Sequence, residues 1–245
     1  MALAREQSRK LFAVLIDPDK MKMSGIDKVI RNGIESGIDF FFIGGSLIVS
    51  DMLDKCINAI KVACDIPVVL FPGNSYQLSY KADGILFLSL ISGRNPELLI
   101  GNHVLAAPFL KLSALEILST GYLLIDGGVA TTVSYISNTQ PIPAAKPDIA
   151  ACTAMAGEML GMKLIYLDAG SGALRPVSAE TINAVANSID VPIIVGGGIR
   201  SPEAAILAAE AGADIIVVGN AIESAPELIF EIASAVHRIG QPVAK

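Results

Sequence analysis

Short apolar runs rich in β-branched and aromatic residues alternate along this chain with segments of helical hydrophobic spacing. The apolar runs lie at residues 12–17, 40–44, 67–71, 84–88, 121–125, 163–167, 192–196 and 213–218. Helical spacing is clearest at residues 25–36, 50–64, 178–188 and 202–211. Eight predicted strands alternating with helices indicate an α/β protein of the (β/α)8 TIM-barrel type. A doubly wound open sheet is the alternative, since strand counts from one sequence err by an element or two.

Two connections depart from the regular pattern. Residues 72–83 are few for a parallel crossover that carries a packed helix, and they begin with Pro, Gly and Asn, so we expect an extended segment in place of the third helix. Residues 127–162 are long and begin with a stretch rich in Pro and Thr, which we expect over the barrel mouth. Residues 226–239 predict an amphipathic last helix that closes the barrel. With neither linker nor low-complexity tract, residues 1–245 are expected to form a single barrel domain.

Composition narrows the function classes. The chain is 52% hydrophobic, with a mean hydropathy of +0.58, yet no stretch reaches the roughly 18 apolar residues of a spanning helix. Parallel strands covered on both faces account for the apolar content, to which a groove for an apolar substrate would add. A net charge of −6 without a basic stripe disfavours nucleic acid. The basic N-terminus precedes only a short apolar run, which is unlike a signal peptide, and the three cysteines fit a reducing cytoplasm.

Glycine-rich turns follow the last three predicted strands. Their sequences are YLDAGSG at residues 166–172, VGGGIRS at 195–201 and VVGN at 217–220. Such turns direct backbone N–H groups at an anion, and barrels often bind phosphate with the loops after the last two strands. Ser201 and Pro202 predict an N-cap and first residue of the following helix. We therefore expect a phosphate cup here, although glycines also simply end strands in tight turns.

Two acids follow predicted strands at the same end of the barrel. Asp17 in IDPDK, assisted by the hydroxyl of Ser46 in IGGS, suits Mg²⁺, which takes few protein ligands and keeps several waters. Asp168 lies within the first glycine turn and is placed to accept a proton from a bound phosphate ester. Each acid has a structural alternative, as an Asx turn for Asp17 and as a turn cap for Asp168.

Other polar residues are less informative. His103 and His237 are the only histidines, and neither neighbours a predicted site along the chain, which disfavours imidazole catalysis. Asp51 and Asp54 form a single DxxD pattern, for which solvated helix surface is the preferred interpretation.

The ordered series FAVLIDPDK, FFIGGSLI, LFPGN, LSLISGRNPELLIGNHV, GYLLIDGG, TQPIP, MKLIYLDAGSGA, PIIVGGGIRS and ADIIVVGN covers nearly the whole chain. It resembles the geranylgeranylglyceryl phosphate synthases and their bacterial relatives. The resemblance implies a modified barrel that lacks the third helix. It also implies transfer of a prenyl group, geranylgeranyl in the namesake enzymes, from a prenyl diphosphate to the 3-hydroxyl of sn-glycerol 1-phosphate, the first ether-bond step of archaeal-type lipid synthesis.

The resemblance assigns roles to residues. Asp17 and Ser46 match the Mg²⁺-binding positions, and Asp168 matches the proposed base, where relatives usually carry Glu. The positions that match the glycerol-phosphate site are Tyr166, Leu167, Asp168, Ala169, Gly170, Ser171, Gly172, Gly197, Gly198, Gly219 and Asn220. A homo-oligomer, dimer or hexamer, is also implied. For a lipid product, peripheral membrane contact during release is a further expectation. Prenyl chain length does not follow from the motifs.

Two alternatives stay open. A phosphate-binding barrel isomerase or lyase of amino-acid biosynthesis would share the glycine turns but would need no apolar groove. A non-catalytic barrel that binds a phosphorylated metabolite would use Asp168 only as a structural cap.

Overall fold

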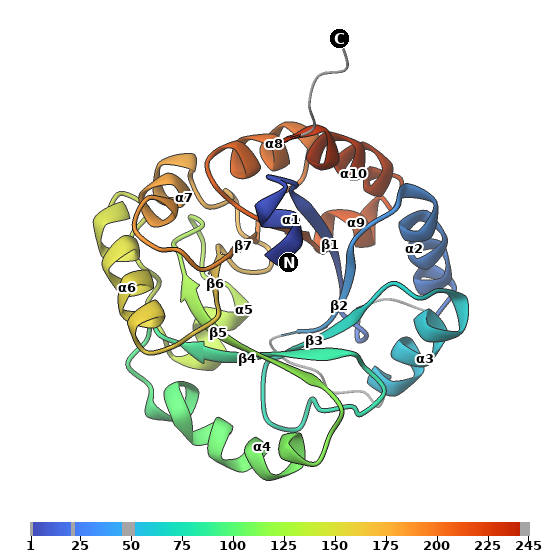
Figure 1. Ribbon diagram of the computed structural model, residues 1–245, viewed down its shortest axis with the longest axis horizontal. Helices are drawn as coiled ribbons and strands as arrows, with labels where there is room; N and C mark the ends of the chain where they lie inside the picture. Colours follow the sequence, from blue (N-terminus) through green and yellow to red (C-terminus); the bar gives the residue numbers. More distant parts are fainter. Residues whose placement is uncertain (1, 21–22, 46–51, 241–245) are drawn as a thin grey trace.

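The computed structural model describes residues 2–20, 23–45 and 52–240. Its eight parallel strands pair in chain order, and β8 pairs with β1, so the sheet closes into a barrel and the open-sheet alternative is excluded (Figure 1). The strands are β1 Leu11–Ile16, β2 Phe40–Gly45, β3 Val68–Pro72, β4 Gly84–Leu90, β5 Glu116–Leu124, β6 Leu164–Asp168, β7 Ile193–Gly196 and β8 Ile215–Val218.

Helices surround this barrel. They are α1 Ala2–Glu6, α2 Met23–Ser36, α3 Leu53–Ala63, α4 Asn102–Lys111, α5 Thr132–Ser137, α6 Pro147–Met159, α7 Ala179–Ala186, α8 Pro202–Glu210, α9 Asn220–Ser224 and α10 Leu228–Arg238, with a π-helical turn η1 at Glu97–Gly101 before α4. The predicted last helix is confirmed, because α10 packs on α8, α2 and β1 and buries Ile229, Ile232 and Val236.

The helix that follows the third strand in a regular (β/α)8 barrel is missing here, as predicted. No helix lies between β3 and β4, and residues 73–83 instead form local turns. The Tyr76 N–H donates to the Asn74 side chain at 2.9 Å and the Gly73 N–H donates to Gln77 Oε1 at 2.9 Å. Leu78 and Ala82 pack against the core, so this segment covers its part of the barrel without a helix.

Alternation along the strands divides the core into two layers. Inward side chains such as Phe42, Tyr122 and Tyr166 fill the barrel, whereas outward ones such as Phe41 and Leu167 pack under the helices. Both faces of each strand are therefore apolar, which explains the near-continuous apolar runs. The fifth strand was predicted at residues 121–125, which is wrong at its start. It begins at Glu116 because its first residues pair with β4, although their outer side chains are only partly buried.

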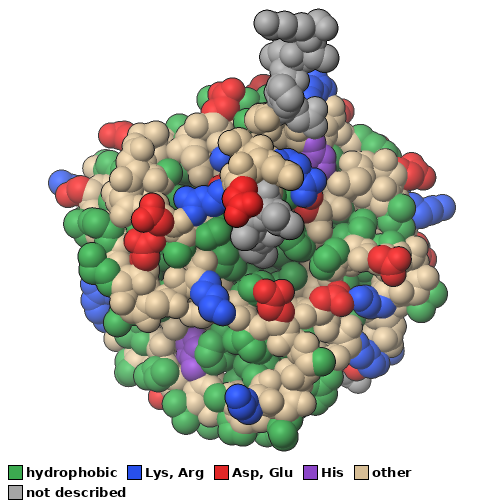
Figure 2. All heavy atoms as spheres, viewed as in Figure 1, with side chains coloured by type: hydrophobic (Ala, Val, Ile, Leu, Met, Phe, Trp, Pro, Cys, Tyr) green, Lys and Arg blue, Asp and Glu red, His purple; other side chains and the backbone are tan. Residues whose placement is uncertain are grey.

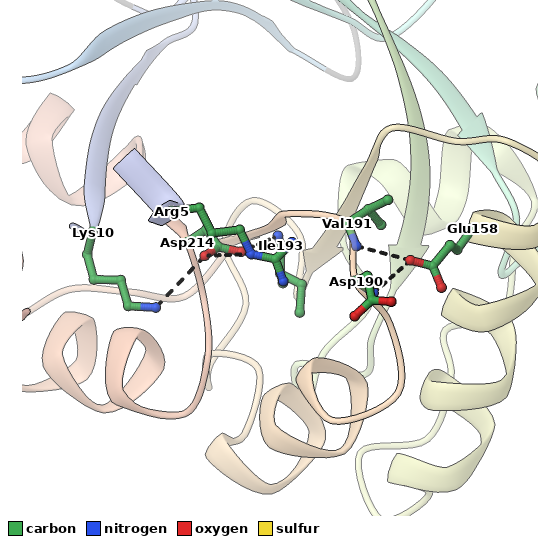
Figure 3. Close-up of polar contacts among 7 residues, drawn as sticks. All are labelled: Arg5, Lys10, Glu158, Asp190, Val191, Ile193 and Asp214. Atoms are coloured by element: carbon green, nitrogen blue, oxygen red, sulfur yellow. Dashed lines mark hydrogen bonds and ion pairs between the residues drawn. The ribbon is translucent and has the colours of Figure 1, made fainter. Parts of the chain in front are cut away.

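The N-terminal ends of the strands form the closed end of the barrel. Helix α1 lies across this end, where Ala4 is buried among the inward side chains (Figure 1). Figure 3 shows polar contacts here: Asp214 accepts the Ile193 N–H at 2.9 Å and lies 4.0 Å from the Lys10 Nζ. Glu158 accepts the Asp190 N–H at 2.7 Å (Figure 3). These contacts fix the start of β7 at the end of the barrel that α1 covers.

Charged and apolar side chains intermingle on the closed face of the molecule (Figure 2). Apolar side chains gather near α4, where Val104, Leu105, Phe109 and Leu112 are exposed. None of the described helices is long and apolar enough to cross a membrane.

Candidate active site

A polar pocket opens at the carboxyl ends of β1, β6, β7 and β8. Most of the predicted site residues line it: Asp17, Tyr166, Asp168, Ser171, Gly172, Gly197, Gly198, Gly219 and Asn220. Three others do not line it: Gly170, and Leu167 and Ala169, whose side chains are buried in the layer between strands and helices. Gly170 contributes its N–H, which donates to Asp168 Oδ1 at 2.7 Å. Ser46 lies outside the described residues.

The glycine turns pack tightly against one another. Gly197 has a φ of +77°, and a Cβ on it would lie 2.3 Å from Asp168 Oδ1 and 2.6 Å from the Gly170 nitrogen. Gly198 has a φ of +73°, and a Cβ on it would meet the Arg175 carbonyl at 2.8 Å. Only glycine permits both this backbone conformation and this close approach. At Gly172, Gly197 and Gly198 the turns after β6 and β7 thus present backbone to the pocket, as an anion site requires.

The helix after β7 begins as predicted. The Ser201 hydroxyl accepts the Ala204 N–H at 3.3 Å, and Pro202 is the first residue of α8. The N-terminal end of α8 therefore follows the Gly197–Gly198 turn directly, and its dipole favours negative charge at the pocket.

Lys20 brings a positive charge into the pocket. Its Nζ lies 3.1 Å from Asp17 Oδ2 and donates to Ser171 Oγ at 3.2 Å. Ser171 Oγ in turn donates to Asn220 Oδ1 at 3.0 Å, so one chain of contacts joins the loops after β1, β6 and β8. The sequence prediction missed Lys20, although it belongs to the IDPDK motif; the only signal was its position three residues after Asp17.

Asp168 lies in the wall of the pocket, with 7% of its surface exposed. Tyr122 Oη donates to its Oδ2 at 2.5 Å, and the Gly170 N–H holds the other oxygen. Burial raises the pKa of the Asp168 carboxyl, while these two hydrogen bonds oppose part of that rise. Burial also raises the pKa of Tyr122 well above its ordinary value, which keeps the phenol protonated. A carboxylate with a raised pKa is a better proton acceptor near neutral pH.

Asp17 lines the polar pocket and forms the Asx turn that was its structural alternative. Its Oδ1 accepts the Asp19 N–H at 3.1 Å, which is the expected Asx turn. The same carboxylate faces the pocket opposite Gly45, on which a Cβ would lie 3.0 Å from Oδ2. Its Oδ2 is paired with the Lys20 ammonium, and the described residues contain no group of three acidic, histidine or cysteine ligands.

An apolar pocket adjoins the polar one. Gly45 and Phe71 line both pockets. The apolar pocket runs beneath residues 72–78 and along the inner face of α4, and its walls include Leu86, Leu88, Leu90, Leu98, Ala106, Leu110, Tyr122, Val133 and Ile136. Val133 and Ile136 belong to α5, and Thr132 of the same helix lines the polar pocket, so the long fifth connection lies over the mouth, as predicted.

His103 also lines the apolar pocket, so the prediction that neither histidine neighbours a site is wrong for this residue. The ring lies edge-on to Phe87 with centroids 4.4 Å apart, and its Nε2 is 3.2 Å from Ser89 Oγ. Burial lowers the pKa of His103 and favours the neutral imidazole, which suits an apolar wall. Asp54 is bound to Lys81 at 3.0 Å on the surface of α3, in agreement with its surface interpretation, whereas Asp51 lies outside the described residues.

The protein is thus a closed parallel α/β barrel of the kind found in enzymes. Its candidate site has two parts, because an amide-lined polar cup adjoins an apolar pocket at the mouth. Comparison with known proteins specifies the family. The model of the PcrB family matches residues 3–236, and the chain belongs to this family.

Named relatives cover almost the whole chain. A protein from Chitinophaga pinensis named geranylgeranylglyceryl phosphate synthase is 59% identical over 236 residues, which is 96% of this chain and 93% of the relative. An archaeal protein of the same name from Thermococcus kodakarensis is 44% identical over 220 residues, covering 89% of this chain and 86% of the relative.

Solved structures agree with this assignment. The (S)-3-O-geranylgeranylglyceryl phosphate synthase of Thermoplasma acidophilum, solved with its substrate sn-glycerol-1-phosphate, superimposes with a TM-score of 0.91 at 33% identity, covering 97% of this chain and 98% of that one. A thiamine phosphate pyrophosphorylase from Pyrococcus furiosus, at 13% identity and a TM-score of 0.59 with 96% and 98% coverage, shares the fold alone.

Proposed function

We propose that this protein transfers a prenyl group, geranylgeranyl by the names of its relatives, from a prenyl diphosphate to the 3-hydroxyl of sn-glycerol 1-phosphate. One observation carries the proposal: the polar cup and the apolar pocket meet at Gly45 and Phe71, beside the buried carboxylate of Asp168. A prenyl transfer needs these three features together, since a hydrocarbon chain, an anionic ester and a proton acceptor must converge on one carbon atom.

The polar cup is the site for glycerol phosphate. The N–H groups of the turns at Gly197 and Gly198, the start of α8 and the ammonium of Lys20 offer complementary positive charge to a phosphate. With the phosphate held there, the glycerol hydroxyl extends toward Asp168. Holding the hydroxyl beside the reacting carbon lowers the barrier by up to roughly 7–11 kcal/mol in favourable cases.

The apolar pocket is the site for the prenyl chain. Its walls are aliphatic and aromatic, so burial of the chain contributes about 25 cal/mol for each Å² removed from water. The diphosphate end then lies near Gly45, opposite the Asp17 carboxylate.

Asp17 is the residue that would hold Mg²⁺, and Ser46 is its proposed partner. When bound, Mg²⁺ supplies charge neutralisation for a departing diphosphate. Lys20, paired with Asp17, adds a second positive charge on the same side of the cup.

Neither of the two alternative functions, a small-metabolite isomerase or lyase and a non-catalytic binding barrel, requires the apolar pocket. An isomerase or lyase of small phosphorylated metabolites accounts for the cup but not for the adjoining apolar space, and the barrels at 13–19% identity share only the fold. A non-catalytic barrel accounts for neither the apolar pocket nor a buried carboxylate that faces the cup.

The test is direct incubation of the purified protein with radiolabelled sn-glycerol 1-phosphate, Mg²⁺ and prenyl diphosphates of several lengths. The expected result is an organic-extractable ether product that depends on Mg²⁺. Tight binding of the ester without product at any chain length would favour the binding module instead. Light scattering of the same preparation tests the proposed homo-oligomer, and sedimentation with vesicles tests membrane contact.

A further inference from the structure

Tyr122 stands between the two pockets. It projects inward from β5, is paired in register with Tyr166 of β6, and is only 5% exposed. Its ring contacts Tyr166 with centroids 5.5 Å apart and Phe71 at 6.2 Å. Tyr122 lines the apolar pocket, whereas its hydroxyl reaches Asp168, which lines the polar cup. The phenol oxygen thus lies where the two substrates of the proposed transfer have to meet.

The Asp168 carboxylate is fixed on both of its oxygens. Gly170 donates its N–H to Oδ1 at 2.7 Å and Tyr122 donates its hydroxyl to Oδ2 at 2.5 Å. An aspartate also holds its carboxylate one methylene nearer the backbone than a glutamate does. Oδ2 is therefore hydrogen-bonded to the phenol and does not extend freely into the cup. The phenol oxygen of Tyr122 lies nearer the apolar pocket than the carboxylate does and can contact a group there.

We propose that Tyr122 relays the proton of the acceptor hydroxyl to Asp168. As the glycerol oxygen forms its bond to the allylic carbon and the bond from that carbon to the diphosphate oxygen breaks, the hydroxyl proton passes to Tyr122 Oη. The phenol proton passes to Asp168 Oδ2 in the same step, so that Tyr122 begins and ends neutral and Asp168 ends protonated. This inference rests on the proposed prenyl transfer and adds a residue to it.

The surroundings favour a relay over a phenolate base. Burial and the neighbouring Asp168 charge disfavour ionised Tyr122, so the phenol accepts a proton only while it gives one up. The carboxylate that receives that proton is itself buried, which favours its protonated form. Both tendencies direct the proton to Asp168.

The experiment compares kcat and KM of the wild type with those of Y122F, D168E and Y122F/D168E. Y122F is expected to lower kcat by about 100-fold or more, the range of general acid–base effects, while affinity for glycerol 1-phosphate in calorimetry changes little. D168E is expected to lower kcat when Tyr122 is present, because the longer side chain competes with the phenol for the space next to the acceptor hydroxyl. In the Y122F background D168E is expected to raise kcat, since glutamate then reaches the hydroxyl directly.

The matched control is Y166F, because Tyr166 is a buried tyrosine of the same aromatic cluster, and its hydroxyl makes no hydrogen bond to Asp168 within the described residues. D168E is expected not to rescue any defect of Y166F. A Y122F enzyme with kcat within about threefold of the wild type overturns the relay. So does a Y122F defect that D168E fails to improve, since this would assign Tyr122 a packing role.

A measurement on the wild type covers the case in which Y122F does not fold. Single-turnover transfer in mixtures of H₂O and D₂O is expected to show a curved dependence on deuterium content, because two protons move together. A linear dependence overturns the relay in favour of direct transfer to Asp168. Absence of ether product from the wild type with every prenyl diphosphate refutes the proposed function and the relay with it, and is distinct from either outcome above.

Discussion

The contact between the turns after β6 and β7 predicts that Gly197→Ala disrupts both stability and ester binding. The added Cβ would lie 2.3 Å from Asp168 Oδ1, 2.6 Å from the Gly170 nitrogen and 2.8 Å from the Ala169 nitrogen. Two of these atoms are backbone, so the strain is not relieved by rotating a side chain. The left-handed backbone costs alanine about 1–2 kcal/mol and overpacking about 1–3 kcal/mol more, so the free energy of unfolding should fall by roughly 2–5 kcal/mol.

Gly161→Ala is the matched control for this prediction. Gly161 has a φ of +87°, close to the +77° of Gly197, but a Cβ there would have nothing within 4 Å. Urea unfolding should therefore show only the left-handed backbone cost in G161A and a clearly larger loss in G197A. Calorimetry should show weakened glycerol 1-phosphate binding in G197A alone. Equal unfolding energies for the two variants, with ester affinity unchanged in both, would refute the inference that the two turns form the cup by close backbone contact.

Three further outcomes follow from the site. Asp17→Asn should abolish transfer while leaving calorimetric affinity for glycerol 1-phosphate nearly intact; equal loss of both would show that the two sites are not separate. Asp168→Asn should raise the melting temperature at pH 7, because the folded state raises the carboxyl pKa and burying the charge is costly above it. This gain should shrink as pH falls through the raised pKa toward the unfolded value, and a gain that is constant with pH would contradict it. Ala106→Phe, which fills the apolar pocket, should weaken transfer from geranylgeranyl diphosphate more than from geranyl diphosphate, and equal effects on the two donors would place the chain elsewhere.

Much of the fold was predictable because strands that are buried on both faces appear in the sequence as continuous apolar runs. The strands around Phe41, Ile194 and Ile216 are uninterrupted apolar runs, and their order and number predicted the barrel correctly. The missing helix was predictable from the 11 residues at 73–83, which are rich in turn formers. The start of β5 was not, since the polar residues Glu116, Ser119 and Thr120 leave Ile117 and Leu118 as an isolated apolar pair.

The site was predictable where it depends on chain order and unpredictable where it depends on side-chain direction. Glycine turns after consecutive strands had to meet at the mouth, and they do. Strand alternation, applied to β6, would already have placed Tyr166 and Asp168 inward and Leu167 outward. The bond between Tyr122 and Asp168 joins residues 46 positions apart on neighbouring strands, and no local pattern encodes it. It follows from register, because β5 and β6 pair Tyr122 with Tyr166 and Leu124 with Asp168.

The missing third helix connects the fold to the proposed chemistry. In a regular barrel a helix would cover the strands next to β3 and fill the space beside α4. Here residues 73–78 line one side of the apolar pocket. Helix α4 lines the other side with Ala106 and Leu110. The pocket then reaches the mouth at Phe71, the last residue but one of β3, where it meets the polar cup. An irregular connection in place of one helix thus leaves room for an apolar pocket beside the turns that are proposed to bind phosphate.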